Sequence, residues 1–183
     1  MKSVNKKLIV AAEEGLEFEV EALLQVPGCN ALIPGVFGIT VLMRAASKGH
    51  EACVRLLLPV SDAGAMDEEK ITALMWAARG GHKACVELLI PASDTSAQDA
   101  SGLTALMGAA GRGYAACVQL LLPASDALVQ DSDGRTASAR ARRGGHEVVA
   151  ELIDAYVLAQ HERTTIGDAL GNGTPHGRAS PRM

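Results

Sequence analysis

Side chains that could do chemistry recur along this chain at one fixed spacing. Thiols, imidazoles and carboxylates are the groups that bind zinc or that act as nucleophile and base in catalysis. The recurring residues, spaced by 32 residues or a multiple of 32, are Cys53, Cys85 and Cys117, His50, His82 and His146, and Asp67, Asp99 and Asp131. This regular spacing requires a choice between a chemical site and a repeated scaffold.

The three periodic cysteines are predicted to be buried core residues. Packed helices keep their axes about 8–10 Å apart, whereas a disulfide requires Cα atoms within about 7 Å of each other. Thiols at equivalent points of successive units should therefore neither form a disulfide nor share a tetrahedral zinc, and small buried apolar side chains are the better interpretation. Cys29, in an irregular segment near the N-terminus, is a candidate free thiol.

The histidines and aspartates are also interpreted as structural residues. Tyr114 occupies the histidine position in one unit, so a capping or packing role is favoured over metal binding or catalysis. The three aspartates lie at loop positions, where they are expected to accept hydrogen bonds from turn amides. No Ser-His-Asp set, phosphate-binding glycine loop or Cys-x-x-Cys pair is recognisable. We therefore predict no enzyme activity, no cofactor and no metal site.

The elements that position these residues follow from the stretch Thr104–Leu122, which reads TALMGAAGRGYAACVQLLL. Thr104 suits an N-cap because its hydroxyl can accept an orphan backbone N–H. A short helix over 105–111 is ended by Gly113, which can adopt the left-handed conformation. A second helix follows and stops at Pro123, which cannot continue it. Neighbouring units repeat this pattern, so each is a helix-turn-helix followed by an extended loop.

These residues resemble the ankyrin repeat. The repeated core is Gly-x-Thr-Ala-Leu-Met-x-Ala-Ala-x-x-Gly-His-x-x-Cys-Val-x-Leu-Leu, and the resemblance covers about residues 4–158. Ankyrin repeats run about 33 residues and read Thr-Pro-Leu-His at the first helix. Here methionine replaces that histidine in three copies, a variant similar to the large ankyrin families of some unicellular protists, and we expect packing to replace the imidazole hydrogen bonds. The resemblance implies an all-α ankyrin-repeat solenoid of about five helix-turn-helix units with extended loops.

The period divides the chain into six segments. The last unit has Ser138 and Arg142 where its neighbours have leucine and alanine, as expected of a terminal cap with a polar face. Glycine and proline become frequent after Gln160, which predicts disorder. The segments are an N-terminal capping repeat at 4–37, repeats at 38–69, 70–101 and 102–133, a C-terminal capping repeat at 134–160 and a disordered tail at 161–183.

Composition limits the choice of partners. Apolar residues make up 48% of the chain but aromatic residues only 3%, which predicts a core of small aliphatic side chains. A net charge of −4 gives no general attraction to nucleic acid or to acidic membranes. The uncharged stretch 22–43 is interrupted by proline and glycine and is no credible membrane span. We expect a cytoplasmic protein whose partner is neither nucleic acid, membrane nor a small-molecule substrate.

Residues that break the repeat are the candidates for partner binding. Three neighbouring positions on the first helix of each unit collect six basic residues and the only tryptophan, with glycines between them that are expected to leave room for a partner. This helix stripe consists of Arg44, Lys48, Trp76, Arg79, Arg112, Arg140 and Arg143. The candidates at the loop tips are Glu68, Glu69 and Lys70. Lys70 occupies the position of Gly102 and Gly134, so it is strained if that position has a positive φ.

Tryptophan and arginine are the residue types that most often anchor interfaces. The helix stripe is therefore interpreted as an interface for a protein segment with acidic or aromatic side chains. The alternative is a solvated surface whose arginine stems cover apolar helix. The sequence predicts a non-catalytic protein–protein interaction module or scaffold that binds through its loop tips and concave helix face. The alternative function is a regulatory ankyrin subunit or fragment of a larger enzyme such as a kinase.

Overall fold

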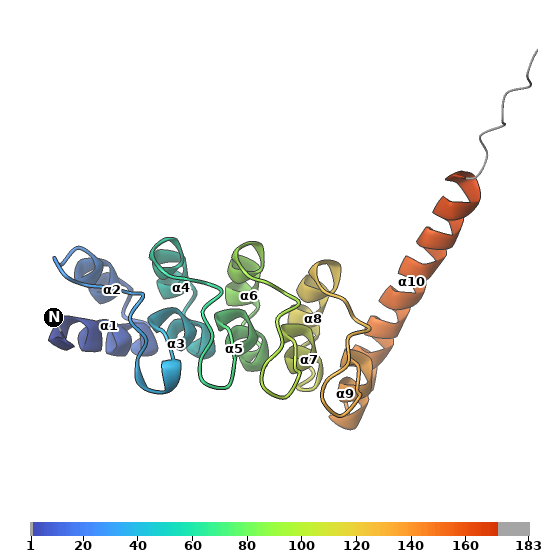
Figure 1. Ribbon diagram of the computed structural model, residues 1–183, viewed down its shortest axis with the longest axis horizontal. Coiled ribbons are helices and arrows are strands. Elements are labelled where there is room, and N and C mark those ends of the chain that lie inside the picture. The colour runs from blue at the N-terminus through green and yellow to red at the C-terminus, as the bar shows by residue number, and fades with distance from the viewer. Residues whose placement is uncertain (1, 172–183) are drawn as a thin grey trace, which may run out of the picture.

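The computed structural model describes residues 2–171 as a single row of helix pairs (Figure 1). Ten α-helices lie within these residues, and each pair is joined by a tight turn. Their bounds are α1 Lys2–Glu14, α2 Glu17–Leu24, α3 Val41–Lys48, α4 Glu51–Leu57, α5 Ala73–Gly80, α6 Lys83–Leu89, α7 Ala105–Ala110, α8 Ala115–Leu121, α9 Ala137–Arg143 and α10 Glu147–Gly171. The predicted all-α repeat fold is confirmed.

The helices form two layers, and the loops extend from one of them. Helices α1, α3, α5, α7 and α9 pack side by side as the inner layer, and α2, α4, α6 and α8 form the outer layer (Figure 1). The long loops before α3, α5, α7 and α9 project past the inner helices (Figure 1). Each inner helix therefore presents one face beside a row of loop tips.

Threonine caps begin four of the inner helices, as predicted. The hydroxyl of Thr104 accepts a hydrogen bond from the amide of Met107 at 3.3 Å, and Thr40, Thr72 and Thr136 make the equivalent bond. In one unit the methionine also takes part, because the amide of Thr40 donates to the sulfur of Met43 at 3.4 Å. There the thioether retains one polar contact, where only packing is expected from the sequence.

A ring from the next repeat fills the space beside the left-handed glycine that follows each of the first four inner helices. Gly81 has φ 74°, and a Cβ placed on it would lie 2.7 Å from the ring of Tyr114. The ring of His82 fits against Gly49 in the same way, and its Nε2 is 3.0 Å from the carbonyl oxygen of Ser47. His50 makes the equivalent bond to Glu13 at 2.9 Å. The predicted packing role is confirmed, and the histidines that make these bonds link consecutive repeats.

The periodic cysteines lie in the core, as predicted. Cys53, Cys85 and Cys117 are fully buried among leucine, valine and alanine side chains, and none is in a disulfide. Burial raises the pKa of the Cys85 thiol to about 11. Cys29 is a half-buried free thiol whose pKa is also raised by burial. A raised pKa suppresses the thiolate, so the core cysteines are suited to packing rather than to nucleophilic chemistry.

A buried aspartate shapes each of the loops before α5, α7 and α9. One carboxylate oxygen of Asp99, Oδ1, accepts from the amides of Ser101 and Leu103, both at 2.8 Å. Asp67 and Asp131 bind the equivalent amides, and all three residues are at most 8% exposed. The predicted capping of turn amides is confirmed.

Backbone hydrogen bonds join neighbouring loop tips. The amide of Ala100 donates to the carbonyl of Glu69 at 2.9 Å, and that of Ser132 donates to Ser101 at 3.1 Å. The tips therefore form one continuous edge.

The last helix pair closes the stack with polar contacts. The guanidinium of Arg142 donates to Ser138 at 2.9 Å, to Glu147 at 3.1 Å and to Asp154. Ser138 and Arg142 stand where the preceding unit has Leu106 and Ala110, so the face of α9 that carries them is polar, as expected of a terminal unit.

Residues 161–171 are helical, in contrast to the disorder predicted for them. Helix α10 continues past Gln160 to Gly171, because no proline interrupts it and a single glycine such as Gly167 costs a helix only about 1 kcal/mol. The remainder of the predicted tail, 172–183, lies outside the described residues. None of the helices described between residues 2 and 171 is long and apolar enough to cross a bilayer.

Lys70 is strained, as its position in the repeat predicts. Its φ is 60°, while Gly102 and Gly134 at the equivalent positions have φ of 75° and 74°. The left-handed conformation costs a residue with a Cβ about 1–2 kcal/mol. We expect Lys70→Gly to raise the free energy of unfolding by about 1 kcal/mol, measured by urea denaturation.

The reciprocal change at the next loop is the control for Lys70. A Cβ at Gly102 would lie 2.9 Å from the backbone nitrogen of Ser132, so Gly102→Ala should lower stability. Equal or lower stability of Lys70→Gly would contradict the assignment of strain.

The bond between His82 and the carbonyl of Ser47 is expected to stabilise the junction of two repeats. His82→Phe keeps a ring beside Gly49, as Tyr114 does beside Gly81, but removes the donor. We expect a loss of about 1 kcal/mol in the free energy of unfolding, the net value of one hydrogen bond. Thermal and urea denaturation measure it, and unchanged stability would show that ring packing alone holds the junction.

Candidate protein-binding surface

The helix stripe predicted from sequence lies along the inner helices. Lys48, Arg112 and Arg143 are exposed, whereas the other four members are half-buried. The stripe residues come from α3, α5 and α9 and from the turn after α7, so the row of inner helices places them on successive repeats. The stripe residues fall into two groups, according to whether or not the side chain binds a buried aspartate.

The first group binds the buried loop aspartates. The indole Nε1 of Trp76 donates to Oδ2 of Asp67 at 3.1 Å, and the guanidinium of Arg140 pairs with Oδ2 of Asp131. In both cases the donor lies nine residues after the aspartate. Since Oδ1 already accepts two loop amides, each carboxylate is satisfied on both oxygens.

Asp99 obtains its partner from the inner helix before its loop rather than from the inner helix after it. Gly108 stands nine residues after Asp99 and has no side chain, and Arg79 from α5 instead pairs with Oδ2 of Asp99. A Cβ on Gly108 would lie 2.9 Å from Cγ of Arg79, so the glycine makes room for this arginine. Arg79 thus occupies the space beside Gly108 that was expected to be left for a partner, although Gly108 also lines a cavity on this surface.

The pKa of Asp131 reflects these contacts. Burial opposes ionisation of the carboxyl group, but the hydrogen bonds from the amide of Arg135 and from the guanidinium of Arg140 outweigh it and hold the pKa below its usual value. Arg140 thus neutralises a buried charge in the loop that precedes its own helix.

The second group of stripe residues keeps its charge available. Among the described residues, Lys48, Arg112 and Arg143 form no ion pair or side-chain hydrogen bond. Arg44 is intermediate, with a guanidinium nitrogen 3.6 Å from a carboxylate oxygen of Glu13.

A cavity of about 410 Å³ lies where the stripe meets the loop tips. Arg79, Arg112 and Arg140 line it together with Glu69 and Ser101, and Met107 is among its apolar lining residues. Of the three guanidinium groups that line this cavity, only that of Arg112 forms no ion pair or side-chain hydrogen bond with a described residue. Among the described residues, the hollow therefore contains one unpaired cation, Arg112, and one unpaired carboxylate, Glu69, whereas Arg79 and Arg140 already pair with buried aspartates.

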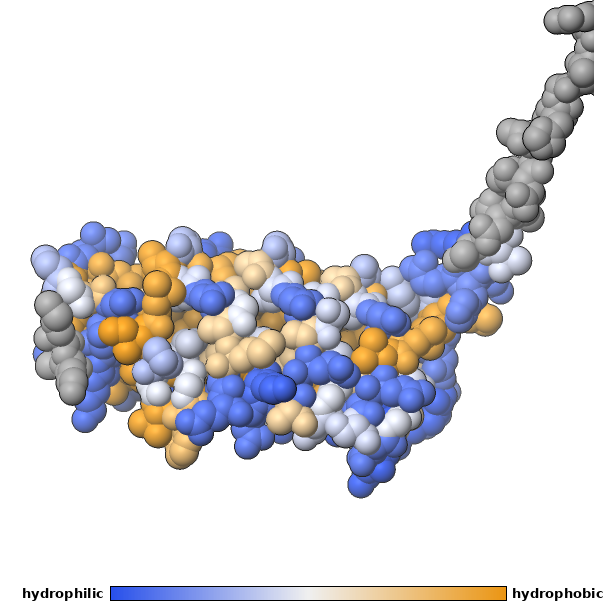
Figure 2. Space-filling model, viewed as in Figure 1, coloured by the Kyte–Doolittle hydropathy of each residue, from blue (hydrophilic) through white to orange (hydrophobic). Residues whose placement is uncertain are grey.

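The loop tips fall into an apolar and a polar part. Glu68, Glu69 and Lys70 are exposed, as expected of binding candidates. Sequence reasoning missed Val36 and Phe37 on the preceding tip, which are 69% and 65% exposed. Alignment at the 32-residue period would have placed them at the positions of Glu68 and Glu69. Figure 2 shows hydrophobic colour at the tip of the loop before α3 and largely hydrophilic colour at the tips that follow.

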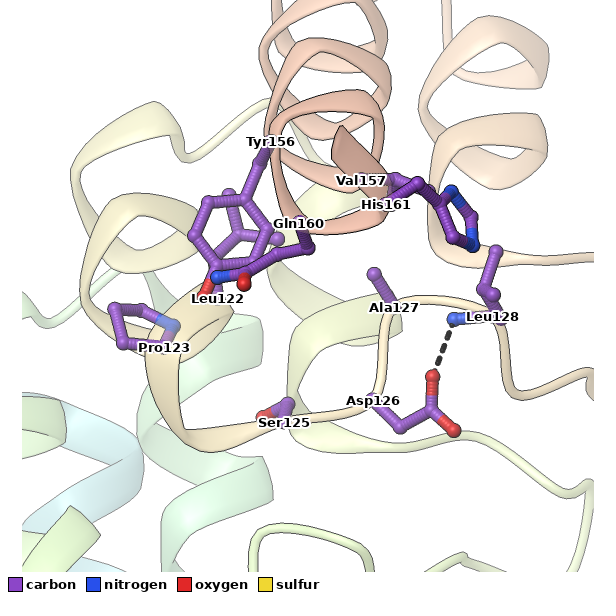
Figure 3. A pocket seen from close by; sticks show the side chains of 10 residues that line it. All are labelled: Leu122, Pro123, Ser125, Asp126, Ala127, Leu128, Tyr156, Val157, Gln160 and His161. Atoms are coloured by element: carbon purple, nitrogen blue, oxygen red, sulfur yellow. Dashed lines mark hydrogen bonds between the residues drawn. The ribbon is translucent and has the colours of Figure 1, made fainter. Parts of the chain in front are cut away.

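A smaller hollow of about 210 Å³ lies at the C-terminal end of the stack, between the loop after α8 and helix α10 (Figure 3). Leu122 and Leu128 line it from the loop after α8, and Tyr156 and Val157 line it from α10 (Figure 3). The amide of Leu128 donates to Asp126 at 2.8 Å and holds this loop in a turn. No stripe residue lines this hollow. No group of described His, Cys, Asp and Glu residues is arranged to hold a metal ion.

Comparison with known proteins agrees with the repeat geometry. None of the curated proteins compared with the chain matches it. The family model described as ankyrin repeats (3 copies) matches residues 8–99 and 91–164, which together cover most of the chain. The chain belongs to the ankyrin repeat family.

Proposed function

We propose that this chain is a non-catalytic module that binds a protein partner through the helix stripe and the adjacent loop tips. Ankyrin repeats are in general protein–protein interaction modules. The observation that supports the proposal most directly is a set of three exposed cations along the inner helices, Lys48, Arg112 and Arg143, which pair with no residue in the described part of a protein with a net charge of −4. A scaffold role and a cytoplasmic location, both predicted from the sequence, remain proposals.

The unpaired cations define which part of the stripe meets the partner. Arg79 and Arg140 each neutralise a buried aspartate, so pairing them with a partner would leave a buried carboxylate without its cation, at a cost of several kcal/mol. Arg112 carries no such cost, and it lines the cavity between stripe and tips. We propose that an acidic side chain of the partner pairs with Arg112, and that Lys48 and Arg143 attract the flanking segment.

The size of the cavity is consistent with a short anchoring segment. Ligand pockets in proteins measure about 300–1,000 Å³, and this one, at about 410 Å³, accommodates one or two side chains. The remainder of a standard interface, about 800 Å² on each partner, would come from the loop tips and the neighbouring helix faces.

Charge reversal at Arg112 tests the proposed function. Tagged chain is used for affinity purification from the source cell, and recovered proteins are quantified by mass spectrometry. We expect Arg112→Glu to lower recovery of the specific partners at least tenfold, because attraction to an acidic segment becomes repulsion. Trp76→Ala is a poorer test, since it also removes the hydrogen bond to buried Asp67.

Lys83→Glu is the matched control, because Lys83 is an exposed cation at the start of the outer helix α6. It changes the net charge equally on the other layer and should retain the partners. Thermal denaturation must show both variants folded. Unchanged recovery with Arg112→Glu would contradict the proposal, and a catalytic protein among the specific partners would identify the regulatory-subunit alternative.

A further inference from the structure

The loop before α3 exposes large apolar side chains at its tip and along its length. Leu32 and Ile33 are 57% and 47% exposed, and Val36 and Phe37 are 69% and 65% exposed. The chain contains only two phenylalanines, and both are exposed rather than used in the core. The corresponding tips of later repeats carry Glu68 and Glu69, then Ala100 and Ser101, then Ser132 and Asp133. The first tip therefore differs in chemistry from the others.

Phe37 is held in a conformation that large residues rarely adopt. It lies in the short helical turn η1, Val36–Gly38, with φ 60° and ψ 26°. Positive φ at a bulky residue is a conformational outlier that persists only where surrounding structure imposes it, and such strain is concentrated at binding sites.

The next loop holds the backbone of this tip in place. The amide of Glu68 donates to the carbonyl of Phe37 at 3.1 Å, and Gly38 packs so closely on Asp67 that a Cβ would lie 3.2 Å from the Cα of that aspartate. The backbone that displays the ring is thus fixed before any partner binds, which lowers the entropy lost on binding.

The groups beside Phe37 on the next tip are acidic. Glu68 and Glu69 are exposed and follow each other directly, and Lys70 is the adjacent cation. Neither glutamate forms an ion pair with a described residue. An apolar side chain next to two carboxylates that lack an ion pair complements a segment in which a large apolar residue lies next to a basic residue.

We infer that Val36, Phe37, Glu68 and Glu69, here called the tip patch, bind a protein segment in which a large apolar side chain lies next to lysine or arginine. This inference rests on the proposed function and names the partner chemistry for one end of the surface. The apolar side chain packs on Phe37 and Val36, and the cation pairs with Glu68 or Glu69. The two glutamates disfavour an anionic membrane as the occupant, because they repel its surface.

Selection from a random ten-residue phage-display library tests the tip patch. Wild-type protein and Phe37→Gly are screened in parallel, since glycine removes the ring and tolerates the positive φ. Sequences enriched only on wild type are expected to place Leu, Phe, Ile or Trp within three positions of Lys or Arg. No enrichment of wild type over the variant, or enrichment of acidic sequences, overturns the inference.

Affinities of the most enriched peptide, labelled with fluorescein, then separate the contributions by fluorescence anisotropy. Phe37→Gly and Phe37→Asn should each weaken binding at least tenfold, and Glu68→Lys with Glu69→Lys should weaken it by a similar factor. Phe18→Ala is the matched control, because Phe18 is 84% exposed on α2 and should leave affinity unchanged. Equal weakening by Phe18→Ala, or none by the Phe37 variants, overturns the inference.

Three further measurements distinguish the other outcomes. Cosedimentation with phosphatidylcholine vesicles that depends on Phe37 would assign the patch to a membrane instead. A dimer in sedimentation velocity that dissociates in Phe37→Gly would assign it to a second copy of the chain. Arg112→Glu should leave the selected peptide bound. Loss of cellular partners in Arg112→Glu therefore tests the proposed function, and loss of the peptide in Phe37→Gly tests this inference.

Discussion

The buried aspartate at the base of a loop connects the scaffold of this protein to its surface. Oδ1 binds two amides and shapes the loop, and Oδ2 requires a donor from the inner helices. A carboxylate that is only 7–8% exposed is unfavourable unless both oxygens are satisfied. This requirement explains why Trp76, Arg79 and Arg140 stand where they do. A conspicuous part of the helix stripe is therefore maintained by folding and would be present in a protein with no partner.

Packing at the junctions between consecutive repeats holds the stack together. A ring fills the space beside a glycine one repeat earlier at four positions, which are His50, His82, Tyr114 and His146. The core is a continuous series of mainly leucine, methionine, alanine, valine and cysteine side chains. Such a stack has no central core that one substitution could empty, since each unit depends on its neighbours. Strain at an exposed tip, as at Phe37 and Lys70, is tolerated because a neighbouring loop is hydrogen-bonded to that tip, Glu68 to Phe37 in the first case and Ala100 to Glu69 in the second.

The 32-residue period predicted the elements well because the same local physics applies in each copy. Threonine caps, left-handed glycines and the prolines that end the α-helices need only residues that are close in sequence. All of them are found in the structure, where each of these prolines stands in a short 3-10 helix. The repeat pattern was less informative about the surface, since the ion pairs there depend on how far each arginine side chain extends. That Arg79 crosses to Asp99, twenty residues away, follows from the missing side chain at Gly108 and not from any motif. Phe37 was missed because its unit departs from the repeat. The length of α10 was underestimated because a high frequency of glycine does not by itself end a helix.

The contact from Arg79 across Gly108 to Asp99 also limits how this array can change by gain or loss of units. In a tandem duplication of residues 70–101, the first copy of Arg79 would meet the second copy of Trp76 where Gly108 now stands. That tryptophan would occupy its space and donate to its aspartate, which would leave one guanidinium without a carboxylate. The repeats 70–101 and 102–133 are thus a matched pair whose order matters. Units of similar sequence are therefore not interchangeable modules.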